Sequence, residues 1–164
     1  MAEWEWLARL YDAHAEALYR FLLQLTRCEA TARDLLQDLY VKWARRPPPE
    51  LPPAEMRRYL IRSAYRQFID SRRRWLVWHR KHEEAAHELP LWFDPAAHTG
   101  HPHLPALEAA LAALPPEQRA IVHLKIWQDM TFAEIATTLA ISPHTAASRY
   151  RYALDKLSTA LRSP

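Results

Sequence analysis

Residues 131–157, TFAEIATTLAISPHTAASRYRYALDKL, decide the fold of the C-terminal part of the chain. Thr131 followed three residues later by Glu134 is a capping box, because the Thr hydroxyl can accept from a first-turn N–H while the Glu carboxylate reaches back to the Thr131 N–H. The pattern therefore predicts a helix that begins at about Phe132. Its apolar residues recur at three- and four-residue steps and are Phe132, Ile135, Ala136 and Leu139.

A second helix is predicted to follow almost at once. Ser142 is a favoured N-cap residue, and Pro143 suits the first helical position, where its missing N–H has no partner to lose. The buried face of this helix is predicted to consist of Ala146, Tyr150, Ala153, Leu154 and Leu157. The outward residues near its N-terminal end are His144, Thr145, Ala147, Ser148 and Arg151, with Arg149 at the flank.

Two helices about three residues apart, with the small Ala136 where they must cross closely, match a helix-turn-helix, whose second helix can enter a DNA major groove. An ordinary αα-hairpin in a helical bundle would show the same periodicity. The exposed face favours DNA binding, because small polar residues and arginines at a helix N-terminus suit phosphates and base edges. A bundle would require apolar residues there.

Composition points to an all-α protein. The chain has 164 residues, 49% of them apolar, and can bury one medium core or two small ones. A single Gly and 13 Pro argue against a β-rich fold. The lone Cys28 excludes an intramolecular disulfide and a cysteine-based zinc site, which favours a reducing cytosol. With no export signal and no run of about 18 apolar residues, we expect a cytoplasmic protein without membrane insertion.

Charge is unevenly distributed along the chain. Residues 51–82 carry nine basic and two acidic groups, whereas residues 83–120 carry one basic and six acidic groups. This contrast indicates a module that binds a polyanion, followed by a linker.

Three helices are predicted before the linker, at about 4–25, 30–44 and 54–80, with a proline-rich loop at 47–53 between the last two. The second helix presents Asp34, Gln37 and Asp38 on its outer face. An acidic pair four residues apart could serve catalysis or bind a metal, but no His, Ser or further carboxylate accompanies it at matching spacing. A solvated face or a protein-docking face is the favoured interpretation.

The third helix carries a row of arginines with aromatic residues between them. The arginines are Arg57, Arg58, Arg62, Arg66, Arg72, Arg73 and Arg74, and the aromatic residues are Tyr65, Trp75 and Trp78. Arginines next to accessible rings provide phosphate contacts and stacking surfaces for unpaired bases. The alternative is a solvated basic face, which is less favoured because only Asp70 offsets the charge.

The chain also resembles a known family. LYDAHAEALYRFLLQLT, ARDLLQDLYVKWAR and MRRYLIRSAYRQFIDSRRR are similar to the N-terminal conserved region of the small bacterial RNA polymerase sigma factors of the extracytoplasmic function (ECF) group. LPPEQRAIVHLKIWQDMTFAEIATTLAISPHTAASRYRYALDKL is similar to their C-terminal conserved region. The resemblance covers about residues 7–75 and 107–161 in the family's order.

This resemblance implies roles for individual residues. Core RNA polymerase is expected to bind Asp34, Leu35, Gln37 and Asp38. The −10 promoter element is expected to be opened and held by the 47–53 loop and by Arg57, Arg58, Arg62, Tyr65, Arg66, Arg72, Arg73 and Arg74. The −35 element is expected to be bound as a duplex by Ser142, His144, Thr145, Ser148, Arg149 and Arg151.

Two departures from the family pattern bear on the helix-turn-helix. Many members carry Gly in the turn where this chain has Ala140, so we expect this Ala at positive φ at a cost of about 1 kcal/mol. Ala147 and Tyr152 replace common basic residues, which should weaken duplex binding and flatten its salt dependence.

The sequence thus predicts two small helical domains, at 1–80 and 107–164, joined by a flexible linker at 81–106. His98, His101 and His103 in that linker could bind a transition metal, but no cysteine accompanies them and a plain linker is favoured. The resemblance implies a transcription initiation factor with no catalysis, cofactor or metal, whose partners are core RNA polymerase, promoter DNA and an anti-sigma factor. A stand-alone helix-turn-helix repressor and an adaptor that titrates an anti-sigma protein are the alternatives.

Overall fold

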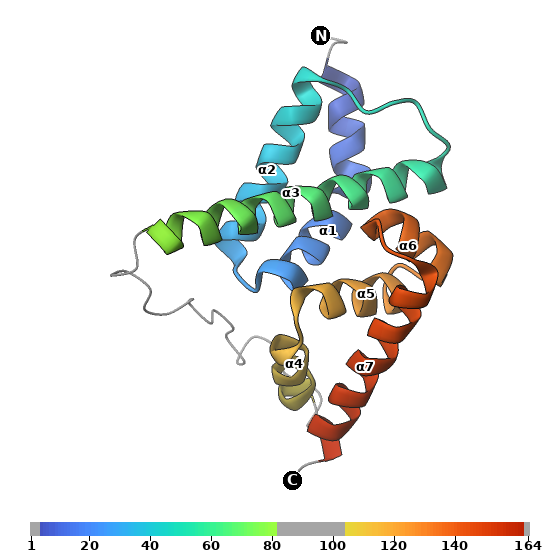
Figure 1. Ribbon diagram of the computed structural model, residues 1–164. Coiled ribbons are helices and arrows are strands. Elements are labelled where there is room, and N and C mark those ends of the chain that lie inside the picture. Colours follow the sequence, from blue (N-terminus) through green and yellow to red (C-terminus); the bar gives the residue numbers. More distant parts are fainter. Residues whose placement is uncertain (1–3, 82–103, 163–164) are drawn as a thin grey trace. The chain divides into compact units, whose positions relative to one another are not determined.

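The computed structural model describes residues 4–81 and 104–162 and divides the chain into two compact units, one within residues 1–91 and the other within 92–164. Every helix of the described residues belongs wholly to one unit (Figure 1). The predicted all-α fold is confirmed. The predicted linker, including the candidate metal ligands His98, His101 and His103, lies mostly outside the described residues, although residues 104–106 open a helix.

The N-terminal unit contains α1 (Glu5–Thr26), α2 (Glu29–Arg45) and α3 (Pro53–Lys81). Each of the three helices packs against the other two. Their shared core consists of Leu18, Phe21, Leu22 and Leu25 from α1, Ala32, Leu35, Leu39, Tyr40 and Trp43 from α2, and Leu60, Ile61, Ala64 and Phe68 from α3. The three helices lie within one or two residues of their predicted bounds.

Tyr40 links the upper part of α2 to α1. Its hydroxyl donates to the Leu10 carbonyl at 3.4 Å, and its ring lies 5.0 Å from Tyr11 and 5.1 Å from Trp43. Burial, and to a lesser degree the neighbouring Tyr11, raises the pKa of the Tyr40 phenol. The Tyr11 ring contacts Tyr40, although 52% of the residue stays exposed.

The C-terminal unit contains α4 (Leu104–Ala113), α5 (Pro116–Ile126), α6 (Phe132–Leu139) and α7 (Pro143–Arg162). The long α7 packs against α4, α5 and α6. One core cluster consists of Ala110, Leu111, Leu114, Val122, Ala153 and Leu157. Arg119 is 8% exposed and donates to the carbonyls of Ala112 and Leu114 at 2.8 and 3.0 Å, so its guanidinium satisfies the C-terminal end of α4 and joins α5 to it.

The predicted helix-turn-helix is confirmed by both of its caps. The Glu134 N–H donates to the Thr131 hydroxyl at 3.2 Å and the Thr131 N–H donates to the Glu134 carboxylate at 2.9 Å, which completes the capping box. The Thr145 N–H donates to the Ser142 hydroxyl at 3.0 Å at the start of α7. Between the helices, Ala140 takes the left-handed conformation (φ 56°, ψ 47°), as its position in the turn predicted.

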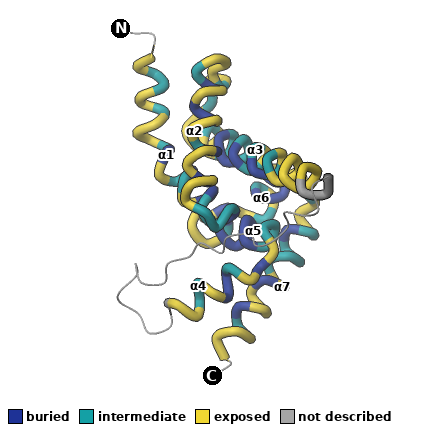
Figure 2. The backbone as a smooth tube through the Cα atoms, turned by 90° about the vertical axis from the view of Figure 1, so that its left-hand side faces the viewer, coloured by how far each residue is buried: buried dark blue, intermediate teal, exposed yellow. Residues whose placement is uncertain are grey.

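Burial along the chain corrects one detail of the predicted faces (Figure 2). Leu154 was predicted to be buried but is 40% exposed, because it lies to one side of the stripe of Ala146, Ala153 and Leu157 that the other helices cover. On α3, Ile61 is 1% exposed and belongs to the core. Within the described residues, no helix is both long and apolar enough to cross a membrane.

Candidate binding surfaces

The outer side of α2 carries the predicted polymerase-binding residues. Asp34, Gln37 and Asp38 are exposed, whereas Leu35 is 4% exposed and packs in the core. Leu35 therefore holds the helix in place and is not presented with the other three side chains. At 100° per residue, Val41 falls on the same side as Asp34 and Asp38, and it is 44% exposed.

Val41 extends this surface in a way that the sequence analysis missed. The signal was present, since Val41 lies three residues after Asp38 and off the buried stripe of Leu35, Leu39 and Trp43. An exposed apolar side chain beside polar ones is typical of a surface that binds a protein. We call Asp34, Gln37, Asp38 and Val41 the α2 face.

The predicted −10 residues divide between two sides of α3. Helical periodicity places five of them on the side away from the core, and we call these five residues the α3 outer face: Arg58, Arg62, Tyr65, Arg66 and Arg73. Arg66 and Arg73 are exposed, and the other three are half-buried. Arg73 lies 3.9 Å from Asp70, an exposed pair that neutralises little of the local charge.

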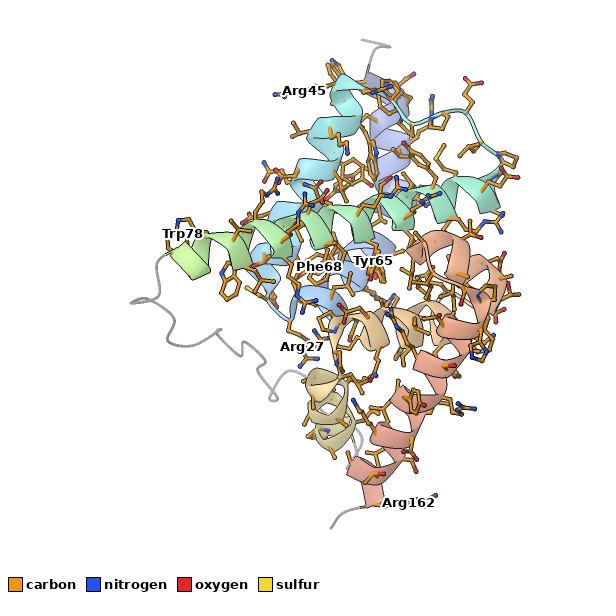
Figure 3. All side chains as sticks on the ribbon, viewed as in Figure 1. Arg27, Arg45, Tyr65, Phe68, Trp78 and Arg162 are labelled. Atoms are coloured by element: carbon orange, nitrogen blue, oxygen red, sulfur yellow. The ribbon has the colours of Figure 1, made fainter. Side chains whose placement is uncertain are left out.

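Arg57, Arg72 and Arg74 do not share this outer face. Arg57 projects from the side of α3 that packs on α1, where burial first and its positive charge second lower the pKa of His14. Trp75 and Trp78 also lie on the side of α3 that carries the core residues, not between the arginines of the outer face. In Figure 3, Trp78 stands at the end of α3, well away from Tyr65 and Phe68 in the middle of the helix.

The predicted −35 residues cluster at the start of α7, where two of them already have local partners. The Ser142 hydroxyl caps the helix and lies 2.8 Å from the Thr145 hydroxyl, so this pair fixes the helix start. His144, Ser148 and Arg151 lie on the side opposite the buried Ala146 and Ala153.

Arg149 and Arg151 differ in their surroundings. Arg149 lies at the flank of α7 and is half-buried, whereas Arg151 is exposed. The Arg151 guanidinium lies 5.6 Å from the centre of the Tyr152 ring, close enough for a cation–π contact. The start of α7 therefore offers hydroxyls, an imidazole and a cation on one short helical surface, at the N-terminal end of a helix, where a phosphate is favoured.

The turn between α5 and α6 supports this arrangement. Lys125 donates to the Met130 carbonyl at 3.2 Å and lies 5.3 Å from the Phe132 ring, which in turn meets Tyr150 edge-on at 5.6 Å. These contacts connect α5, α6 and α7, so the start of α7 rests on a packed support.

Comparison with known proteins assigns the chain to a family. The sigma-70 region 2 model matches residues 10–76 and the sigma-70 region 4 model matches residues 104–157. The ECF RNA polymerase sigma factor SigL of Mycobacterium tuberculosis is 29% identical over 167 residues, which cover 98% of this chain and 92% of SigL. The chain belongs to the ECF group of the sigma-70 family. Its two units thus correspond to regions 2 and 4 of a sigma factor.

Other relatives agree with this assignment. The RNA polymerase sigma-E factor of Streptomyces coelicolor is 29% identical over 146 residues, or 87% of this sigma factor and 78% of that one. The sigma factor RpoE of Bartonella quintana, solved in complex with the anti-sigma factor NepR, has the same fold, with a TM-score of 0.78 and 21% identity over 95% of this chain and 96% of RpoE.

Proposed function

We propose that this sigma factor starts transcription by binding core RNA polymerase through the α2 face and promoter DNA through α3 and α7. The observation that carries the proposal is the order and content of the two units. A cationic helix with an accessible ring follows an acidic docking face in the first unit, and a capped helix-turn-helix forms the second.

The α2 face suits a protein partner better than a nucleic acid. Asp34 and Asp38 would repel phosphates, and the partner surface should therefore be basic or rich in hydrogen-bond donors. Val41 adds apolar area one turn beyond Asp38, and Leu35 anchors the helix from beneath.

The α3 outer face suits melted promoter DNA. Its four arginines can contact successive phosphates, and Tyr65 offers a ring to an unpaired base. The preceding loop contains Pro47, Pro48, Pro49, Pro52 and Pro53. Because proline fixes φ, this loop loses little entropy when it contacts a base.

The start of α7 suits the intact −35 duplex. His144 and Ser148 can reach base edges in the major groove, while Arg149 and Arg151 contact the flanking phosphates. Ser142 and Thr145 act mainly by holding the helix start, since their hydroxyls bond each other.

The proposal also includes the binding partners of this sigma factor and the cell compartment in which it acts. An anti-sigma protein is a further partner in this proposal, which is supported by the complex of the related RpoE with the anti-sigma factor NepR. The factor acts in the cytoplasm and has no catalytic activity of its own, because the polymerase performs the chemistry.

Run-off transcription with purified bacterial core polymerase tests the proposal, with promoters selected from a random DNA library. The intact chain should support specific initiation. Asp38→Arg should abolish it and weaken core binding at least about tenfold, because a buried like-charge contact costs several kcal/mol. Asp12→Arg is the matched control, since Asp12 is exposed on α1 and makes the same charge change.

Two results would contradict the proposal. Core affinity that is unchanged in Asp38→Arg would remove the α2 face from polymerase binding. Specific binding of the selected duplex by the isolated chain as a symmetric dimer, without initiation on addition of polymerase, would indicate a repressor instead.

A further inference from the structure

The turn between α5 and α6 is held on both sides of one residue. The Met130 N–H donates to the Leu124 carbonyl at 3.1 Å, and the Met130 carbonyl accepts from the Lys125 ammonium at 3.2 Å. Met130 is 1% exposed and comes directly before Thr131, the N-cap of α6. Lys125 therefore fixes the point at which the chain enters the helix-turn-helix.

The same ammonium lies over the ring of Phe132, the first residue of α6. It is 5.3 Å from the ring centre, within the range of a cation–π contact. The Phe132 ring meets the Tyr150 ring of α7 at 5.6 Å, with the two planes inclined by 61°. Because α6 packs against both α5 and α7 (Figure 1), these contacts link Lys125 on α5 to Tyr150 on α7.

Tyr150 belongs to the turn of α7 that carries the proposed duplex-binding arginines. It stands between Arg149 and Arg151 in the chain and two residues after Ser148. Tyr150 is half-buried and also packs against the core cluster of the C-terminal unit. Its ring is therefore a point at which the rest of the unit can hold this turn of α7.

We propose that Lys125 is a positioning residue for duplex recognition, which sets the rotation of α7 about its own axis through Phe132 and Tyr150. The inference rests on the proposed function, in which α7 binds the −35 element as a duplex. Lys125 acts through the two rings and does not itself contact the DNA.

A small rotation of α7 is enough to change base contacts. Side chains extend about 6 Å from a helix axis, so a rotation of about 10° moves their ends by about 1 Å. A hydrogen bond to a base edge spans about 2.7–3.2 Å and is lost at that displacement. A phosphate contact depends mainly on charge and tolerates it. Loss of Lys125 should therefore reduce sequence preference and leave binding to unrelated duplexes nearly unchanged.

A direct phosphate contact is the competing role for a lysine in a DNA-binding unit. The structure favours positioning, because Lys125 is half-buried and its ammonium already contacts the Met130 carbonyl and the Phe132 ring. The two roles differ in salt dependence. Each lost phosphate contact lowers the salt slope of duplex binding by about 0.9, whereas loss of a positioning residue leaves the slope unchanged.

Duplex binding by the complex of the full chain with core polymerase tests the inference. The probes are a labelled duplex with the selected −35 element and a scrambled duplex of equal composition, followed by fluorescence anisotropy over a range of salt concentrations. Lys125→Met should lower the preference for the selected duplex at least about fivefold at an unchanged salt slope, since a weakened base contact is worth such a factor. Lys125→Arg should retain most of the preference, because a guanidinium can make both contacts.

Lys156→Met is the matched control, since Lys156 is exposed on α7 and the substitution makes the same charge change. It should leave the preference intact. An unchanged preference in Lys125→Met would overturn the inference. A salt slope lowered by about 0.9 in that variant would also overturn it, because it would identify a direct phosphate contact.

Phe132→Leu tests the route from Lys125 to α7. It should lower the preference as well, and combining it with Lys125→Met should lower the preference no further than the more damaging single variant. Losses that multiply in the double variant would show that the two residues act independently and would overturn the inference.

NMR of the free full chain gives an answer without DNA. The Tyr150 ring resonances should shift in Lys125→Met and stay in place in Lys156→Met. Unshifted resonances in Lys125→Met would overturn the inference. The two proposals fail differently. An intact chain that prefers no duplex sequence in complex with core polymerase would refute the proposed function, whereas a preference that survives Lys125→Met would refute only the positioning role.

Discussion

The two units differ in how their proposed DNA-binding residues are arranged. In the first, α3 spreads its cations along several turns and places rings beside them, and residues 53–78 hold seven arginines against two acidic groups. In the second, the proposed contact residues gather within the first three turns of α7, and residues 131–162 hold four basic and two acidic groups. The first surface depends on charge and stacking, which suit a melted strand. The second depends on the placement of a helix start, which suits a duplex groove.

The largest expected effect comes from removing charge on the first surface. The triple variant Arg58→Ala, Arg62→Ala and Arg66→Ala should weaken single-strand binding by about 100-fold at low salt and lower its salt slope by about 2, at about 0.7 per lost phosphate contact. Measurements of strand affinity against salt concentration check this. Arg9, Arg20 and Arg33, each paired with a glutamate on its own helix, provide a matched triple Ala control. An identical loss in the control would mean that net charge alone governs binding.

A smaller effect is expected from the helix start of the second surface. Ser142→Ala removes the acceptor for the Thr145 N–H and should destabilise the first turn of α7 by about 1 kcal/mol. Hydrogen exchange of the amides in that turn measures this. Thr137→Ala is the control, because the Thr137 hydroxyl donates to a carbonyl within α6 and caps nothing. Duplex affinity that stays constant while the turn frays would show that duplex binding does not depend on the placement of α7.

The turn itself offers a stabilising change. Ala140 sits at φ 56°, where its Cβ is strained, and Ala140→Gly should stabilise the C-terminal unit by about 0.5–1 kcal/mol. Chemical denaturation of the full chain, followed by a probe in the C-terminal unit, tests this. A lower stability in the glycine variant would show that the turn carries no such strain.

The smallest effect concerns pH and belongs to the first unit. Burial and Arg57 lower the pKa of His14 below its ordinary value of 6.5. The unfolded chain therefore binds this proton more readily, so stability should rise with pH through the window just below 6.5 and be lost as pH falls through it. Thermal unfolding at several pH values should show a weaker pH dependence in His14→Gln. A dependence as steep as that of the intact chain would assign the proton to another group.

Local signals made the second unit readable from sequence. Thr131 with Glu134, and Ser142 with Pro143, act on atoms within three residues of each other, so the helix boundaries and the caps were predicted correctly. The strained turn at Ala140 was predicted for the same reason. Helix caps and turns of this kind depend only on residues close in sequence, so a sequence pattern is enough to predict them.

Exposure at the edges of the packing was less readable, because it depends on where distant helices stop. Periodicity alone assigns Phe68 and Trp75 to the same stripe, yet Phe68 is 7% exposed and Trp75 is 41% exposed. The predicted burial of Leu154 on α7 was wrong for the same reason. Arg119 was overlooked because its buried state depends on the carbonyls at the end of α4, which no local pattern around it reveals.

The most direct test of the division between the units is a crossed comparison in the complex with core polymerase. One probe is a selected promoter with an intact −35 duplex and no −10 region, and the other is its premelted −10 strand. Ala variants of Arg58, Arg62 and Arg66 should weaken only the strand, and Ala variants of His144 and Ser148 should weaken only the duplex. Equal losses on both probes by either set would contradict the assignment of melted DNA to one unit and duplex DNA to the other.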